Sequence, residues 1–72
     1  MIPERTKETI DLYVLHGYEP GGFMYAVLTN DLFGAIARAD VENRMNLQAI
    51  CQYIYSNIRS DCWGSKEKVQ SW

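Results

Sequence analysis

The sequence predicts an all-α protein, a compact bundle of about four to five short helices that forms one domain over residues 1–72. Apolar residues recur at the spacing of an amphipathic helix, most clearly between residues 41 and 59. No segment shows the sustained alternation of apolar and polar residues that is typical of a half-buried strand. Gly, Pro, Asn and Asp interrupt the apolar pattern at short intervals, so the helices are expected to be short.

The first helix is expected to begin at Pro3 and to end before Gly17. Proline suits the first turn of a helix, and glycine suits the left-handed residue that follows the last turn. Leu12 and Leu15 fall on a different face of this helix from its main apolar stripe. We therefore expect this second apolar face to contact another subunit.

The next two helices are predicted from their start signals. The second is expected to start within residues 20–23, since proline is favoured at a helix start. Asp31 is then a good N-cap for a third helix over residues 32–39. The apolar stripe of this third helix is expected to comprise Leu32, Ile36 and Ala39.

A longer core helix and a short final helix complete the bundle. Asp40 is a second cap signal, and the core helix is expected to continue without a break over residues 41–59. Ser65 is predicted to cap a last helical turn that ends near Trp72. The residues of the core helix that are expected to face inward are Leu47, Ile50, Cys51, Ile54 and Ile58.

Length and composition together predict a homo-oligomer. A chain of 72 residues buries only about 60% of the surface that its unfolded form exposes. Hydrophobic residues nevertheless make up 47% of this sequence, which is more than a small monomer hides easily. The residues expected at the contact between subunits are Leu12, Leu15, Tyr18 and Tyr25.

Charge and residue spacing exclude several classes of function. Seven basic and nine acidic side chains give a net charge of −2, which argues against binding to duplex DNA or to an anionic membrane surface. No apolar run approaches the roughly 20 residues needed to span a bilayer. Without a leader peptide before residue 1, we expect a cytoplasmic protein with reduced thiols. Cys51, Cys62 and His16 lack metal-ligand spacing, so neither a metal nor a cofactor is expected.

Gly21 and Gly22 stand where the second helix should begin, although glycine is unfavourable inside a helix. Without Cβ atoms, they would let a phosphate approach the free N–H groups of a helix start. Alternatively, they allow a tight turn and the close approach of two helices. The stretch matches neither GxxxxGK[ST] nor GxGxxG, so the sequence leaves both interpretations open.

Arg38 is the second candidate for ligand binding, because the small alanines around it leave room for a guanidinium to reach a carboxylate or phosphate. Asp31 lies near the same helix face and would pair with Arg38 or line a polar pocket, although a capping role alone is the plainer interpretation. His16 is interpreted as a helix-end residue. The complete candidate ligand site comprises Pro20, Gly21, Gly22, Asn30, Arg38 and Trp63.

Three separated motifs together resemble a family of very short proteins encoded by bacteriophages and prophages. They are PGGF, then AVLTNDLFGAIARAD with Asn43, and finally CWGS with Val69 and Trp72. The resemblance covers nearly the whole chain, from the first helix to its end. Relatives often have a second proline where this chain has Glu19, so the glycine turn is expected to be looser here. The resemblance implies a small accessory protein in a bacterial cytoplasm, where such products commonly inhibit host proteins or sequester nucleotide signals.

No arrangement of serine, histidine, cysteine and carboxylate residues indicates catalysis, so we expect no catalytic residues and no enzymatic activity. The leading hypothesis is a homo-oligomeric phage accessory protein that binds a nucleotide-like defence signal or a host defence component. The alternative is a helical module that regulates host or phage machinery through an apolar helix face. A DNA-binding regulator is disfavoured, because the chain is acidic and has no basic recognition helix.

Overall fold

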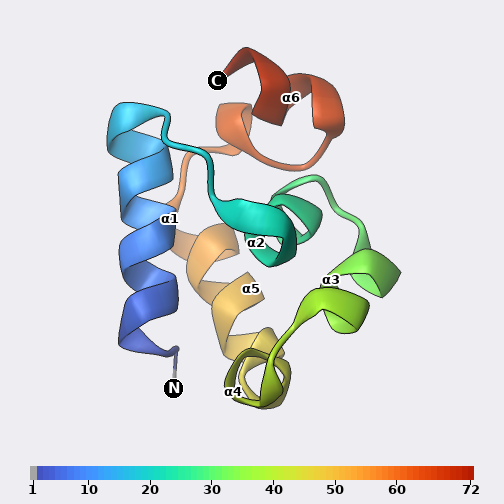
Figure 1. Ribbon diagram of the computed structural model, residues 1–72. Helices are drawn as coiled ribbons and strands as arrows, with labels where there is room; N and C mark the ends of the chain where they lie inside the picture. Colours follow the sequence, from blue (N-terminus) through green and yellow to red (C-terminus); the bar gives the residue numbers. More distant parts are fainter. Residues whose placement is uncertain (1) are drawn as a thin grey trace.

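The structure is a computed structural model that describes residues 2–72, and it confirms the all-α fold. No strand occurs in this part of the chain. The helices are arranged around a common core (Figure 1). The α-helices are α1 (Glu4–His16), α2 (Gly21–Leu28), α3 (Leu32–Arg38), α4 (Val41–Met45), α5 (Leu47–Asn57) and α6 (Lys66–Ser71), and a 3-10 helix η1 (Ser60–Cys62) precedes α6.

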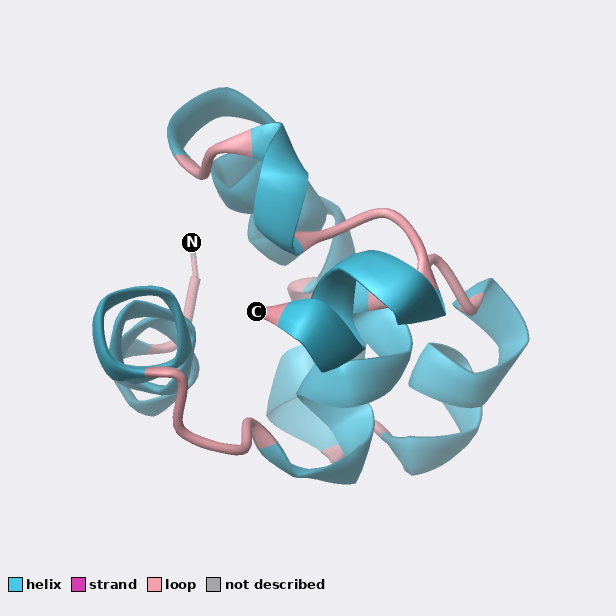
Figure 2. Ribbon diagram, turned by 90° about the horizontal axis from the view of Figure 1, so that it is seen from above, coloured by secondary structure: helices cyan, strands magenta, loops and turns pink. Residues whose placement is uncertain are grey.

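Five of these elements contribute side chains to one apolar core. Figure 2 looks down on the bundle and shows α1 almost end-on at one side, joined to α2 by the loop of residues 17–20. A hydrogen bond of 3.2 Å from the Tyr53 hydroxyl to the Asp11 carboxylate links α5 to α1. The core of buried residues comprises Ile10, Tyr13, Met24, Leu28, Ile50, Ile54, Cys62 and Val69.

The predicted helix caps are confirmed, because their signals are local to the backbone. Asp31, Asp40 and Ser65 each use a side-chain oxygen to accept the backbone N–H three residues further on, over 3.0, 2.8 and 3.2 Å respectively. Gly17 ends α1 with φ 69°, a left-handed conformation that glycine adopts without steric cost. His16 occupies the last turn of α1, as predicted. These caps set the boundaries of four helices.

The predicted core helix is divided at Asn46, and this corrects the expectation of one helix over residues 41–59. The backbone of Asn46 has φ −114° and ψ 17°, and its side-chain amide donates to the carbonyl of Glu42 over 2.8 Å. Such a bond competes with the helical ladder. The buried residues of α5 are Ile50 and Ile54, whereas Cys51, which was predicted to face inward, is exposed.

The predicted apolar stripe of α3 is confirmed at Ala39 and wrong at Leu32 and Ile36. Leu32 and Ile36 are exposed, whereas Ala35 and Ala39 are buried. The reason is that α3 packs closely against α2, where a small side chain fits and a large one does not. The large apolar residues of α3 are therefore left on its outer side.

The C-terminal residues return to α1 and are fixed there. The indole N–H of Trp72 lies 3.2 Å from the carbonyl oxygens of both Tyr13 and Val14. The indole N–H of Trp63 donates to the carbonyl of Ile58 over 3.0 Å. Trp72 is 39% exposed, so it holds the tail by hydrogen bonding more than by burial. Figure 1 shows the C-terminus close to the end of α1.

The Tyr13 hydroxyl donates a buried hydrogen bond of 2.8 Å to the carbonyl oxygen of Cys62. This bond connects α1 with η1 in the core, and the Tyr13 side chain is almost completely buried. Burial, with a smaller contribution from the Cys62 thiol, raises the pKa of Tyr13 to about 12. The folded protein therefore holds this phenol in its neutral form.

The raised pKa of Tyr13 predicts a loss of stability in alkali. An unfolded tyrosine ionises near pH 10, so the contribution of Tyr13 is complete below pH 10 and is lost as the pH rises toward about 12. The loss is expected to reach about 2–3 kcal/mol of unfolding free energy, measured by urea denaturation across this pH range. Tyr13→Phe should lower stability by about 1–3 kcal/mol at neutral pH, because it leaves a buried carbonyl without its donor, and should flatten the alkaline decline.

The exposed Tyr18 provides a control, since Tyr18→Phe removes a phenol that makes no buried bond. Cys51, Tyr53 and Cys62 also have raised pKa values, mainly because the surrounding protein partly removes water from them. All three remain in Tyr13→Phe, so comparing this variant with the unmodified protein isolates the contribution of Tyr13. An unchanged alkaline decline in Tyr13→Phe would contradict the assignment.

Candidate functional site

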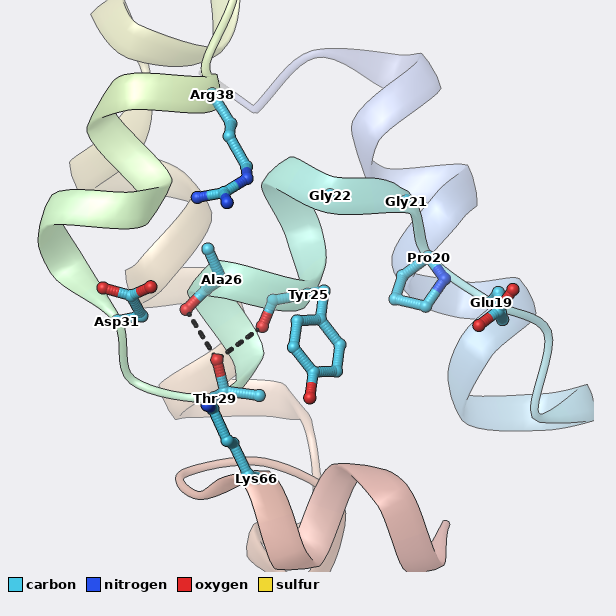
Figure 3. A pocket seen from close by; sticks show the side chains of 10 residues that line it. All are labelled: Glu19, Pro20, Gly21, Gly22, Tyr25, Ala26, Thr29, Asp31, Arg38 and Lys66. Atoms are coloured by element: carbon cyan, nitrogen blue, oxygen red, sulfur yellow. Dashed lines mark hydrogen bonds between the residues drawn. The ribbon is translucent and has the colours of Figure 1, made fainter.

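A cleft of about 790 Å³ lies where α2, α3 and α6 meet. It is open to solvent and combines a helix start with two cationic, two acidic and two hydroxyl side chains (Figure 3). We call it the glycine cleft. Its lining residues are Glu19, Pro20, Gly21, Gly22, Tyr25, Ala26, Thr29, Asp31, Arg38 and Lys66.

The two glycines at this helix start have different structural roles. Gly21 has φ +82°, which lets the chain turn from the loop into α2, and a Cβ built there meets nothing within 4 Å. Gly22 has no such φ and lies within α2. A Cβ on Gly22 would be 3.3 Å from Cδ of Arg38, so this glycine allows the arginine side chain to lie close against α2.

The first turn of α2 presents uncapped backbone amides to solvent. Pro20 is the N-cap residue, and no side chain accepts a hydrogen bond from the first turn. The first N–H groups of a helix have no acceptor within the helix and carry the positive end of its dipole. Both Gly21 and Gly22 are exposed and line the cleft.

Arg38 and Lys66 bring two positive charges to the same cleft. Figure 3 shows Arg38 extending from α3 toward the first turn of α2, and Lys66 extending from α6 toward Thr29. The guanidinium of Arg38 makes one weak hydrogen bond, of 3.3 Å, to the carbonyl of Gly34. Within residues 2–72, neither cation is within ion-pair distance of a carboxylate. Their charges are therefore available to a ligand.

Two carboxylates balance these charges formally, but one of them is already engaged. Asp31 accepts the Gly34 N–H over 3.0 Å as the cap of α3. A Cβ on Gly34 would overlap the Asp31 carboxylate and would lie 3.0 Å from Nη1 of Arg38. Gly34 thus permits Asp31 to cap α3 while Arg38 turns back over the same helix. The predicted pairing of Asp31 with Arg38 does not form, although both line the cleft.

The two hydroxyl groups of the cleft are positioned by hydrogen bonds. Thr29 donates to the carbonyls of Tyr25 and Ala26 over 2.8 and 3.3 Å (Figure 3). The Tyr25 hydroxyl accepts from the Gln70 side chain over 3.2 Å, which leaves its own O–H proton able to donate. Together with the helix amides and the two cations, the cleft offers donors on several sides, an arrangement suited to an anion with several oxygens.

The six residues of the predicted ligand site are divided between two clefts. Pro20, Gly21, Gly22 and Arg38 line the glycine cleft. Asn30 and Trp63 line a different cleft, described below. Lys66 was not predicted, because no local pattern in the sequence indicates that α6 folds back beside α2. Gly34 was not predicted either, although a glycine three residues after a capping aspartate is a local signal for its role.

The four residues predicted at a subunit contact also differ in their surroundings. Leu12, Leu15 and Tyr18 are exposed, Leu15 to 74%. Tyr25 is only partly exposed and lines the glycine cleft. A further set of apolar residues, on α3 and at both ends of α4, is also exposed, and we call it the α3–α4 patch. Leu32 and Ile36 of this patch were expected to face inward. The α3–α4 patch comprises Leu32, Phe33, Ile36, Val41 and Met45.

Comparison with known proteins identifies no relative: no family model, no curated protein and no solved structure matches the chain. Between residues 2 and 72, every helix is too short or too polar to cross a bilayer. In the same part of the chain, no group of three or more histidine, cysteine or acidic side chains is placed to hold a metal ion. Functional inference therefore rests on the geometry of the clefts and on the exposed surface.

The different backbone conformations of the two glycines predict opposite effects of alanine. Gly21→Ala forces a side chain into a left-handed conformation and should lower the free energy of unfolding by about 1–2 kcal/mol. Gly22→Ala should leave it unchanged or raise it by at most about 1 kcal/mol, since helix propensity favours alanine and the exposed Arg38 side chain can shift. Thermal and urea denaturation of both variants checks this. Equal destabilisation would mean that Gly22 is also needed for packing.

Proposed function

We propose that this chain is a non-enzymatic phage accessory protein that acts in the cytoplasm of an infected bacterium. It forms a homo-oligomer and sequesters a nucleotide-like defence signal, or inhibits a host defence component. The phosphate groups of such a signal bind in the glycine cleft. The observation that carries this proposal is the convergence of the uncapped α2 start with Arg38 and Lys66, neither of which has a carboxylate partner within residues 2–72.

A phosphate fits the donors of this cleft better than a single carboxylate does. Helix amides, a guanidinium and an ammonium approach from three elements, so an anion with oxygens on several sides can use all of them. Glu19 and Asp31 make the formal charge of the cleft neutral, which reduces attraction to small anions at long range. Selectivity then depends on donor geometry more than on net charge.

Pyrophosphate is a simple probe of this proposal, with binding measured by isothermal titration calorimetry. Arg38→Ala and Lys66→Ala should each weaken binding about 10- to 100-fold, the effect of losing a charge-assisted hydrogen bond. Arg44→Ala is the matched control, because Arg44 is exposed on α4 and lies outside the cleft. Unchanged affinity in both cleft variants would contradict the proposed site. Native mass spectrometry with and without a bacterial nucleotide extract then identifies the natural ligand by its mass.

Self-association is supported by the amount of apolar surface that the monomer leaves exposed. Leu12, Leu15 and Tyr18 lie at the C-terminal half of α1 and just beyond it. None of these three residues lines the glycine cleft, so a subunit contact there would leave the cleft accessible. Burial of such side chains in a closed symmetric oligomer removes apolar surface from water.

Light scattering tests this arrangement. The unmodified protein is expected to be a dimer or a larger closed oligomer at micromolar concentration, and Leu15→Glu should dissociate it, because a carboxylate cannot be buried at the contact without a partner. Met45→Glu places the same charge on the α3–α4 patch and should leave the assembly intact. A monomeric unmodified protein would exclude self-association. If Met45→Glu dissociates the oligomer and Leu15→Glu does not, the subunit contact lies at the α3–α4 patch instead.

The alternative function is a helical module that binds a partner protein. The α3–α4 patch is the observation that favours it, since Phe33 is 83% exposed and Met45 is 80% exposed. Large exposed apolar side chains that gather on one surface commonly mark a protein contact. Under this alternative, Phe33→Ala abolishes binding to the partner while pyrophosphate has no effect on it.

A further inference from the structure

A second cleft, of about 410 Å³, lies on another side of α2, between the end of that helix, α5 and the turn after η1. It differs from the glycine cleft because no charged side chain lines it. We call it the amide cleft, since three of its side chains are carboxamides. Its lining residues are Val27, Asn30, Gln48, Cys51, Gln52, Ile54, Tyr55, Trp63 and Gly64.

An aromatic pair forms one wall of the amide cleft. The ring centroids of Tyr55 and Trp63 are 6.2 Å apart, with an angle of 58° between the ring planes. The indole N–H of Trp63 is already bonded to the carbonyl of Ile58, which fixes the ring and satisfies its one polar group. The adjacent turn is held by a bond of 2.6 Å from the Gly64 N–H to the Leu28 carbonyl. The Trp63 ring is therefore held in place in this wall, where a flat ring can stack on its face.

The carboxamides give the cleft unused donors and acceptors. The Gln52 amide donates to Ser56 over 2.7 Å, so its carbonyl oxygen is left to accept. Within the part of the chain that the structure describes, the side chains of Asn30 and Gln48 make no hydrogen bond. Each carboxamide can donate and accept at the same time. The cleft thus combines an aromatic face with neutral hydrogen-bonding groups.

We infer that the amide cleft binds a neutral planar heterocycle with donors and acceptors on its edge, the chemical class of the nucleobases. Such a ring stacks on the aromatic wall and pairs its edge with the carboxamides. A phosphate finds no cation there, and a plain hydrocarbon ring leaves the carboxamides dehydrated without a partner. The inference goes beyond the proposed function, because it uses neither Arg38 nor Lys66.

Adenosine is a suitable probe, since it presents the ring and its edge without a phosphate. Two-dimensional NMR of the nitrogen-labelled protein follows the indole N–H signals of both tryptophans. Titration should shift the Trp63 signal saturably and leave that of Trp72 unchanged, because Trp72 lies outside the cleft. Gln48→Ala should weaken binding at least about fivefold, the effect of one lost hydrogen bond. Gln70→Ala, which removes a carboxamide elsewhere on the surface, should not weaken it.

Three outcomes would overturn the inference. One is the absence of a saturable Trp63 shift up to the solubility limit of adenosine. Another is unchanged affinity for adenosine in Gln48→Ala. Gln48 is exposed, so this variant should fold like the unmodified protein, and circular dichroism checks that it does. The third is binding of benzyl alcohol as tight as that of adenosine, because the ring of benzyl alcohol has no hydrogen-bond donors or acceptors on its edge. Adenosine binding should survive Arg38→Ala, so a failure here is distinguishable from a failure of the phosphate site.

Discussion

The buried hydrogen bond between the Tyr13 hydroxyl and the Cys62 carbonyl is the constraint on which the C-terminal third of the fold depends. It joins positions 49 residues apart, and Cys62 itself is fully buried. Trp72 then bonds to the carbonyl of Tyr13, so both ends of the segment that contains α6 are held by α1. Lys66 belongs to α6. The position of this cation in the glycine cleft therefore depends on the buried hydrogen bond between Tyr13 and Cys62.

Helix α2 separates two clefts of different chemistry without carrying any charge itself. Its sequence, GGFMYAVL, offers only backbone amides and the Tyr25 hydroxyl as polar groups. The cations of the glycine cleft come from α3 and α6, whereas the carboxamides of the other cleft come mainly from α5. An apolar helix between unlike neighbours therefore keeps the charged groups of one cleft apart from the neutral groups of the other. This is the physical reason that one short chain can present two clefts of different chemistry.

The sequence predicted those features whose causes are local. Capping by Asp31, Asp40 and Ser65 needs only the residues of one turn, and the all-α fold follows from apolar spacing. The faces of α3 could not be predicted in this way, because their burial depends on how closely α2 approaches. The sequence carried only a weak signal for the helix break at Asn46, namely an asparagine inside a helical pattern. For the site, the glycines and Arg38 were predicted together, while Lys66 required knowledge of the tertiary fold.

Of the three glycines in or beside the glycine cleft, the fold itself requires two, Gly21 and Gly34. Gly21 needs its positive φ, and Gly34 must leave room for the Asp31 carboxylate that caps α3. Gly22 has neither requirement, since the atom that its Cβ would meet belongs to an exposed arginine side chain. A glycine in a helix lowers stability relative to alanine by roughly 0.5–1 kcal/mol. The fold therefore gives no reason for glycine at position 22 except the close approach of Arg38, and this leaves the proposed binding of an anion at the start of α2 as the explanation to test.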